Sequence, residues 1–537
     1  MSRTVESQDN TAEPNQAPEA ENNYYVYGPL KWVIALTASL GAILEVIDVS
    51  IVNVALVYIE GNLGVTTTEV GWVATGYTIA AVIILPLSAW LGERFGRKRY
   101  FVFSLIGFTA ASFACGFAPS FQILVISRII QGLFGGGLLA KAQAILFQTF
   151  PPAEQAIAQA VFGVGVIAGP AIGPTLGGYL TETIGWRSIF FVNVPFGIAA
   201  SVMSIMFLPK DPPQKNKQRA DLPGILSLAL WAGSLQTVLE QGQHDDWFAS
   251  KLIKSLTATF VIGLMVFIGR ELTTKAPAVE LRVLRYRSLA AGSFFSMLLG
   301  IGLYGILFVI PIFAQSILGF DAWQTGLLLA PRALVSAVIM VTLGRVMNKI
   351  DARVIVTCGA VIFSFAAFQL QTINPNTGAE QLLIPLLLTG AAAPLMFLPL
   401  SLASLGPLPP NEVAAGSGFY NLARQFGGSI GIALLTTLLA RREQFHRSIL
   451  VDNISNYNPI FRQQLHQLTS FFERQGSEPS VAAKQALAEI NNRLNTQAAL
   501  LSYEDIFWMV GMLFLVALPL VLLLGKGAAH EKLPSAH

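Results

Sequence analysis

Charged residues are scarce in this chain. Only 12% of its 537 residues are charged and 53% are hydrophobic, whereas soluble domains carry roughly 25% charged residues. The mean hydropathy of +0.58 therefore indicates a polytopic membrane protein. The formal net charge of +3 is too small to suggest a nucleic-acid partner.

Cysteine and histidine are scarce as well, and their positions exclude further chemistry. The two cysteines, Cys115 and Cys358, both fall in apolar runs, so we expect neither a disulfide framework nor a thiolate metal site. All five histidines fall outside the apolar runs. This placement argues against a histidine proton relay or a metal site inside the membrane.

Nucleotide-binding and hydrolytic motifs are missing. The late Gly525-Lys526 pair is followed by glycine and is no Walker A motif, and no polar region is large enough for an ATPase domain. The sequence also has no HExxH motif. We therefore expect a protein that is not an enzyme and needs no cofactor. Transport and a transporter-like receptor function remain as candidate classes.

Long apolar runs dominate the chain instead, and a run of about 20 residues is long enough to span a bilayer. We predict fourteen spans, near residues 31–57, 70–91, 100–118, 121–141, 157–180, 188–208, 221–241, 252–269, 289–313, 324–346, 353–372, 382–404, 415–440 and 504–525. The predicted order is a disordered cytoplasmic tail (1–30), a six-helix bundle (31–208), a linker with two extra helices (209–288), a second six-helix bundle (289–525) with an outer loop (442–502), and a cytoplasmic tail (526–537).

The basic residues of the short loops predict the orientation. With the N-terminus inside, the cytoplasmic loops hold Arg94, Arg97, Lys98, Arg99, Lys210, Lys215, Lys217, Arg219, Arg270, Lys275, Arg282, Arg285, Arg287, Arg345, Lys349 and Arg353. The short outer loops 58–69, 314–323 and 373–381 hold none. Both termini are therefore expected on the cytoplasmic side.

Charged side chains inside the bilayer are costly and mark ion or substrate paths. The candidates that lie well within predicted spans are Glu45, Asp48, Arg128, Arg332 and Arg424. At a rise of about 1.5 Å per residue, Asp48 lies roughly 13 Å and Arg128 roughly 10 Å below the outer face, so the two can meet. Glu45 shares a helix face with Asp48, and two carboxylates this close in poorly solvated surroundings cannot both ionise cheaply. We predict that Asp48, Arg128 and Glu45 couple protons to transport. The alternative is a static ion pair that pins two helices. Arg332 and Arg424 are expected to be either charge partners or packing devices.

A glycine ladder marks the fifth span. Gly165, Gly169, Gly173 and Gly177 recur at every fourth residue and form a side-chain-free ridge on a helix, with Pro170 inside it. We expect a close, bent contact between two helices, and the plain alternative is a packing seam without further function.

A charged turn follows the second span. Residues 89–99 read AWLGERFGRKR, and residues 344–353, GRVMNKIDAR, form a similar turn after the tenth span, which suggests two homologous halves. Glu93, Arg94, Gly96 and Arg97 are candidates for a cytoplasmic latch between helices. They also fit a simple topology signal.

The polar insertion 442–502 is predicted to lie outside the membrane, with helices near 461–473 and 480–501. An apolar stripe of Leu487, Ile490, Leu494 and Leu501 favours an amphipathic cap on the outer mouth. The alternative is a docking surface for a periplasmic adaptor.

Taken in order, EVIDVSIVNVAL (45–56), AWLGERFGRKR, SRIIQG (127–132), the glycine ladder, GWRSIFFVNVPFG (185–197) and SGFYNLARQFGGSIGIALL (417–435) resemble the motif set of the fourteen-helix drug:proton antiporters of the major facilitator superfamily, the EmrB/QacA type. The resemblance covers residues 30–525. It implies a helix-1 acid at Asp48, a proton-transfer motif at Arg128 with Gln131, and an antiporter motif at Gly165, Gly169, Pro170 and Gly173. Ala89, Glu93 and Val57 depart from the usual glycine, aspartate and proline.

The resemblance implies an all-α integral membrane protein with the major facilitator fold: two six-helix bundles and two extra central helices. It further implies proton-driven export of lipophilic small molecules across the bacterial inner membrane. Protons and membrane lipid are the other expected partners, together with a periplasmic adaptor and an outer-membrane channel. The alternative within transport is a dedicated exporter of an endogenous metabolite, siderophore or lipid, and a non-transporting receptor is a remote one.

Overall fold

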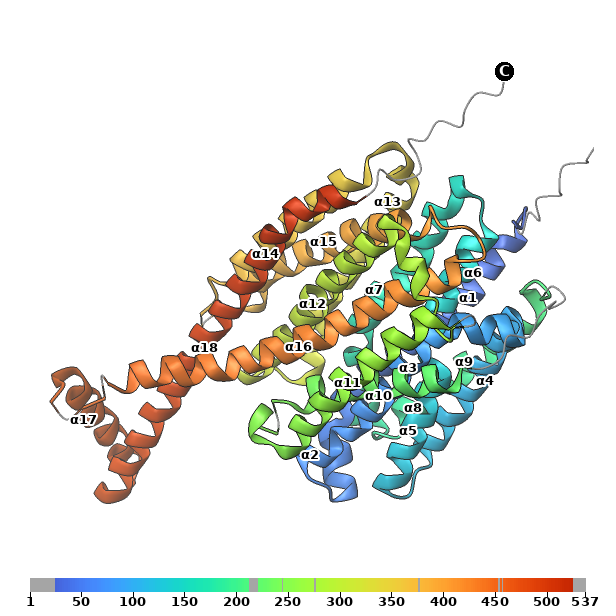
Figure 1. Ribbon diagram of the computed structural model, residues 1–537. Helices are drawn as coiled ribbons and strands as arrows, with labels where there is room; N and C mark the ends of the chain where they lie inside the picture. The colour runs from blue at the N-terminus through green and yellow to red at the C-terminus, as the bar shows by residue number, and fades with distance from the viewer. Residues whose placement is uncertain are drawn as a thin grey trace, which may run out of the picture.

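The computed structural model describes residues 25–211, 221–243, 245–274, 277–374, 377–452, 454–455 and 457–524, and all regular structure in these ranges is helical (Figure 1). The α-helices are α1 (Leu30–Leu63), α2 (Thr67–Val70), α3 (Trp72–Phe95), α4 (Arg97–Gly116), α5 (Phe121–Gly135), α6 (Leu138–Thr149), α7 (Pro152–Thr183), α8 (Ser188–Phe191), α9 (Asn193–Phe207), α10 (Leu222–Gln241), α11 (Lys251–Thr273), α12 (Arg287–Ser316), α13 (Ala322–Val346), α14 (Ala352–Leu370), α15 (Ala379–Leu405), α16 (Val413–Val451), α17 (Pro459–Arg474) and α18 (Pro479–Ala517). Short 3-10 helices are η1 (Trp247–Ala249), η2 (Leu281–Arg285), η3 (Met347–Lys349) and η4 (Leu518–Leu523). Several predicted features lie outside the described residues: residues 1–24 of the expected N-terminal tail (1–30), the expected C-terminal tail (526–537), and the loop residues Lys215, Lys217, Arg219 and Lys275.

Every predicted apolar run coincides with a long helix or a helix pair. Thirteen helices in the described part of the chain are long and apolar enough to span a membrane, and the bent helix α7 brings the number to fourteen. The fourth span is α5 continued by α6, and the sixth is α8 continued by α9. The expectation of an all-helical protein with fourteen spans is confirmed.

The helices form two groups, α1–α9 and α12–α18, while α10 packs on α11, α3 and α16 (Figure 1). Corresponding helices of the two groups pair through glycines: α1 packs on α7, and α12 packs on α16. A Cβ atom added at Gly427 of α16 would lie 2.1 Å from the carbonyl oxygen of Met297, and one added at Gly431 would lie 2.5 Å from that of Ile301. The backbones of α12 and α16 therefore touch only because glycine lacks a side chain. The contact between α12 and α16 in the second half is therefore of the same kind as the contact that the glycine ladder of the fifth span predicts in the first half.

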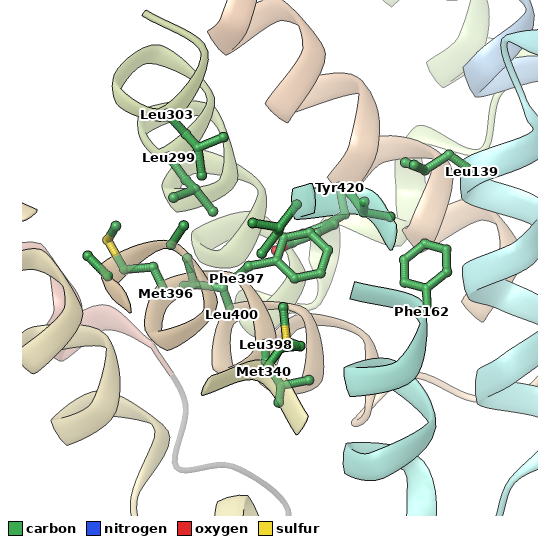
Figure 2. Close-up of a cluster of buried hydrophobic side chains, with 14 of the residues drawn as sticks. Leu139, Phe162, Leu299, Leu303, Met340, Met396, Phe397, Leu398, Leu400 and Tyr420 are labelled. Carbon is green, nitrogen blue, oxygen red and sulfur yellow. The ribbon is translucent and has the colours of Figure 1, made fainter. Parts of the chain in front are cut away.

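The two halves meet along α7 with α13 and along α6 with α16. Figure 2 shows the apolar part of this interface, in which Leu139 and Phe162 of the first half face Met340, Phe397 and Tyr420 of the second. All five side chains are buried. Because tightly packed aromatic and aliphatic side chains leave no room for a solute, this cluster closes the path between the halves at its depth.

A polar group of side chains lies at the same interface. Asn421 Nδ2 of α16 donates to Gln143 Oε1 of α6 at 2.7 Å, and Ser417 Oγ donates to the same oxygen at 3.0 Å. These residues lie near the start of α16 and within α6, on the side where α1 and α7 begin. The halves are therefore joined on the side that the loop charges predict to be cytoplasmic.

The predicted outer loop is mostly a continuation of two spans. Helix α16 runs on to Val451 and α18 begins at Pro479, so the chain between them holds only α17 and short connections. Helices near 461–473 and 480–501 are confirmed by α17 and α18. The two long helices are linked beyond the bundle by Asp505, which accepts from His446 Nε2 at 2.8 Å and lies 3.4 Å from Arg442 Nε.

The expectation of a cap on the outer mouth is wrong. Figure 1 shows α17 and the first part of α18 projecting beyond the end of the bundle, away from the start of α1. Ile490 and Leu494 are buried, yet Leu487 of the same predicted stripe is 48% exposed. The stripe packs within the extension itself, because α17 lies on α18 and the long helices continue in their own direction.

Candidate functional site

A fully buried ion pair lies in the N-terminal half, between α1 and α5. Arg128 Nη1 donates to Asp48 Oδ2 at 2.6 Å, and the two side chains are 1% and 0% exposed. Asp48 Oδ1 accepts from Gln131 Nε2 at 2.9 Å and from Asn193 Nδ2 at 2.7 Å. The contact expected from the helix depths therefore forms, and it holds the carboxylate with one cation and two amides.

The arginine of this pair is fixed by further contacts. Arg128 Nε donates to the carbonyl oxygen of Val73 at 3.0 Å, and its guanidinium lies 4.3 Å from the centre of the Tyr77 ring. A buried pair is net favourable only when such additional bonds satisfy both partners, and removing one partner costs about 3–5 kcal/mol. Arg128 therefore ties α5 to both α1 and α3.

Asn193 is a site residue that the sequence reasoning missed. It begins α9, inside the GWRSIFFVNVPFG motif, and it also donates to Ser112 Oγ at 3.2 Å. The signal in the sequence was a single amide side chain in an apolar run. The match to the motif did not by itself indicate a role for it. Its contact brings a third helix to Asp48.

Glu45 has a different environment from Asp48, although both lie on α1. Its Oε2 atom accepts from the backbone N–H of Leu139 at 2.8 Å, and the residue is 8% exposed. Leu139 lies in the first turn of α6, where backbone N–H groups have no partner within the helix and favour an anion. This turn exists because Gly135, Gly136 and Gly137 interrupt the fourth span. No salt bridge to Glu45 is present among the described residues.

Lys141, also of α6, is a buried cation that the sequence reasoning did not single out. Its Nζ atom donates to Ser104 Oγ at 2.7 Å and lies 3.7 Å from the centre of the Tyr100 ring. Lys141 and Glu45 lie close enough to interact electrostatically without forming an ion pair. The signal in the sequence was a lysine at the end of a predicted span, which reads equally well as an interfacial residue.

The glycine ladder of α7 packs on the segment of α1 that carries both acids. A Cβ atom added at Gly165, Gly169, Gly173 or Gly177 would lie 2.1, 2.8, 1.9 or 2.8 Å from the nearest atom, which belongs to Ile43, Val46, Ser50 or Ile51 respectively. Helix α7 also bends by 47° between Pro152–Pro170 and Ile172–Thr183, next to Pro170. The close and bent contact expected from the sequence is therefore present, and α1 is its partner.

The opposite face of α7 packs on the second half. A Cβ atom added at Gly163 of α7 would lie 2.7 Å from Met340, and one added at Gly344 of α13 would lie 2.5 Å from Ala160. Helix α7 thus stands between helix α13 and the segment of α1 that carries Glu45 and Asp48.

The predicted latch contains a glycine with a positive φ angle. Gly96 has φ +96°, and a Cβ atom there would lie 2.3 Å from Asp211 Oδ2. Asp211 accepts from the backbone N–H of Lys98 at 2.8 Å and of Arg99 at 3.2 Å, and so caps the start of α4. Glycine is required at this turn both for its conformation and for the space.

The charged members of the latch take different positions. Arg97 Nη1 donates to Gln148 Oε1 at 2.7 Å, and Gln148 Nε2 donates to the carbonyl oxygen of Pro410 in the second half at 3.1 Å. The guanidinium of Arg94 lies 5.5 Å from the centre of the Trp90 ring. Glu93 lines a polar cavity of about 250 Å³ together with residues of the segments 277–280 and 411–419. Among the described residues of the predicted latch, Arg97 is thus the one that is connected by hydrogen bonds, through Gln148, to the C-terminal half.

The two arginines of the C-terminal half are both buried. Arg424 donates to Asn421 Oδ1 at 2.8 Å and lies 5.1 Å from the centre of the Phe397 ring. Arg332 is 3% exposed, and its Nη1 atom is buried with no hydrogen-bond partner. Neither arginine forms an ion pair with a described residue. The structure therefore does not bring them to Asp48.

One further acid was missed, on the first extra helix. Glu240 of α10 accepts from Thr78 Oγ1 of α3 and from Gln236 Nε2, both at 2.6 Å, and Gln236 in turn donates to Ser429 Oγ of α16 at 2.8 Å. The sequence analysis places Glu240 at the end of the predicted span 221–241 and gives it no role. Through these bonds α10 contacts both halves.

A bundle of two similar helical halves, with a buried acid–arginine pair and a bent helix at their interface, defines a polytopic membrane transporter. Residues 38–432 match the family model described as Major Facilitator Superfamily. The chain belongs to this family, and within it to the EmrB-like proteins, as the motifs imply.

Curated relatives match nearly the whole chain. It is 32% identical to the "Multidrug export protein EmrB" of Escherichia coli (strain K12), over 91% of this chain and 94% of the relative. It is also 32% identical to the "Fatty acid resistance protein FarB" of Neisseria gonorrhoeae, over 92% of this chain and 97% of the relative. Among solved structures, the proton:xylose symporter XylE superposes with a TM-score of 0.58 at 14% identity, over 91% of this chain and 94% of that one, which supports the fold.

Proposed function

We propose that the protein exports amphipathic small molecules in exchange for protons, and that Asp48 carries the proton. The observation that supports this most is the buried pair of Asp48 and Arg128, with the carboxylate completed by Gln131 and Asn193. An ionised carboxylate at 0% exposure is stable only while these donors surround it. A proton that reaches Asp48 removes the charge that holds them.

The conformational consequence follows from the contacts of α1. Charge-assisted hydrogen bonds are roughly twice as strong as neutral ones, so protonation weakens the link from α1 to α5 and α9. Helix α1 is locked to the glycine face of α7, and the other face of α7 packs on α13. The proton therefore biases the packing between the two halves, which is what alternating access requires.

The names of the relatives support amphipathic substrates, because one is called a multidrug export protein and another a fatty acid resistance protein. The interface cluster of Leu139, Phe162, Met340 and Phe397 is packed shut in this structure, and it would offer apolar surface to such molecules once the two halves separate. We further propose an inner-membrane location with both termini cytoplasmic. The extension of α16, α17 and α18 would then lie outside the membrane, where it is available to a periplasmic adaptor.

The test uses purified protein in proteoliposomes, with proton flux and substrate flux recorded together. Asp48→Asn mimics the protonated, neutral acid. An imposed pH gradient should therefore no longer drive the substrate against its own concentration gradient. Glu45→Gln, on the same helix, tests the other predicted carrier: if Asp48 alone carries the proton, this variant retains coupled transport. If Asp48→Asn still drives uphill transport and Glu45→Gln does not, the proton is carried by Glu45 and the assignment is wrong.

A further inference from the structure

Arg332 differs from the other buried cations in having no partner for part of its guanidinium. Arg128 is paired with Asp48, Lys141 donates to Ser104, and Arg424 donates to Asn421. In contrast, Arg332 Nη1 is buried without any hydrogen-bond partner in the described structure. The residue lies ten positions after the start of α13, roughly 15 Å along the helix. A cation at this depth is costly unless an anion accompanies it.

The helices around Arg332 do not supply that anion. Helix α13 packs mainly on α7 and α15, and less on α12. The sequences of α12, α13 and α14 contain no aspartate or glutamate. The acids of α7 and α15 lie at helix ends, at Glu154, Glu182 and Glu380, far from the middle of the bundle. No acid among the described residues therefore accompanies Arg332, and its negative partner has to come from elsewhere.

The position of Arg332 relative to the apolar interface suggests what that partner is. Gly390 of α15 lies against Arg332, because a Cβ atom added there would be 3.0 Å from Arg332 Cγ. Met340 lies eight residues after Arg332 along α13, and Phe397 lies seven residues after Gly390 along α15. Both are therefore roughly 10–12 Å from the level of Arg332, toward the same end of the two helices. Figure 2 shows Met340 and Phe397 together with Phe162 of the first half. An unpaired cation thus stands about two helical turns from an apolar interdomain surface.

We infer that Arg332 binds the anionic head group of the transported molecule, so that the substrates include amphipathic organic anions. This inference rests on the proposed export function and specifies its substrate class. The head group, a carboxylate or sulfonate, accepts hydrogen bonds from the guanidinium. The apolar part extends along α13 and α15 toward Met340 and Phe397. An anion bound here removes the cost of the unpaired charge, which gives it an advantage over a neutral molecule of the same shape.

The test compares two permanently charged ions with the same ten-carbon chain, decanesulfonate and decyltrimethylammonium. Proteoliposomes containing the full-length protein take up each labelled ion under an imposed pH gradient. Arg332→Gln keeps hydrogen-bonding groups but removes the charge, and Arg332→Lys keeps the charge. A hydrogen bond to a charged group contributes enough that Arg332→Gln should lower kcat/KM for decanesulfonate roughly 10- to 100-fold. Arg332→Lys should recover most of it.

The outcomes separate this inference from the proposed function. Loss of decanesulfonate uptake in Arg332→Gln, with rescue by Arg332→Lys and an unchanged melting temperature, supports the inference. Uptake of decyltrimethylammonium but not decanesulfonate by the wild-type protein overturns it and leaves the export function standing. An equal loss for both ions in Arg332→Gln also overturns it, because the residue would then act on structure or coupling. If the wild-type protein takes up neither ion, the inference is overturned, and the export function is then decided by the Asp48→Asn experiment alone.

Discussion

Replacing Gly173 with alanine tests how closely α1 and α7 must approach. The added Cβ atom would lie 1.9 Å from Ser50 Oγ, 2.7 Å from Ser50 Cβ and 3.1 Å from the backbone nitrogen of Ile51. Carbon atoms prefer separations of about 3.5–4.0 Å, so the two helices have to separate by roughly 1 Å. Because part of the obstruction is backbone, rotation of the Ser50 side chain alone does not remove it.

The expected magnitude has a structural and a functional part. Overpacking a tight interface costs about 1–3 kcal/mol, and alanine recovers about 0.5–1 kcal/mol of helix propensity relative to glycine. The protein should therefore fold, with a small loss of stability. Ser50 is two residues after Asp48, whose bond to Arg128 is 2.6 Å long. A shift of roughly 1 Å lengthens this bond beyond the hydrogen-bonding range. We expect proton-driven transport to fall at least about tenfold, the factor that corresponds to losing one charged hydrogen bond.

The assay is coupled transport in proteoliposomes, with the melting temperature of the purified protein as a check on folding. Gly269→Ala is the matched control, because Gly269 lies inside α11 and a Cβ atom there meets nothing within 4 Å. Ser50→Ala in the Gly173→Ala background removes the nearest obstructing atom and should restore part of the activity. If Gly173→Ala transports as well as Gly269→Ala, the close contact is not required and the role assigned to the glycine ladder is refuted.

Two further predictions concern the latch and the orientation. Gln148→Leu removes the bonds from Arg97 to the second half, at about 0.5–1.5 kcal/mol each, and should open the cytoplasmic side more often. Faster alkylation of a cysteine placed at Ala414, which lines a small cavity with Gln148, would report this opening, and an unchanged rate would count against the latch. In a background without reactive native thiols, a cysteine at Tyr457, which is 94% exposed, should react with an impermeant maleimide in whole cells. A cysteine at Arg99 should react only after permeabilisation, and the reverse pattern would invert the proposed topology.

The sequence by itself determined the spans and the depth of the charges inside them. Hydropathy and a fixed rise per residue convert directly into positions along a membrane helix, which is why Asp48 and Arg128 could be matched before their contact was seen. The four-residue spacing of the glycines likewise predicted a close helix contact, since a missing side chain has the same consequence wherever the helix packs.

Which helices face one another was decided only by the tertiary structure. The spacing of residues in the sequence does not show that the ladder packs on α1, that Asn193 reaches Asp48, or that the backbone N–H of Leu139 binds Glu45. Each of these contacts depends on how one helix is rotated against another. The expectation of a cap was wrong for the same reason. Helices α16 and α18 continue side by side as a pair that is joined at Asp505, and the sequence does not show this pairing. The same reason also applies to Arg332: a sequence shows that a charge lies inside the membrane, but only the packing of α7, α13 and α15 shows that no described residue serves as its counter-ion.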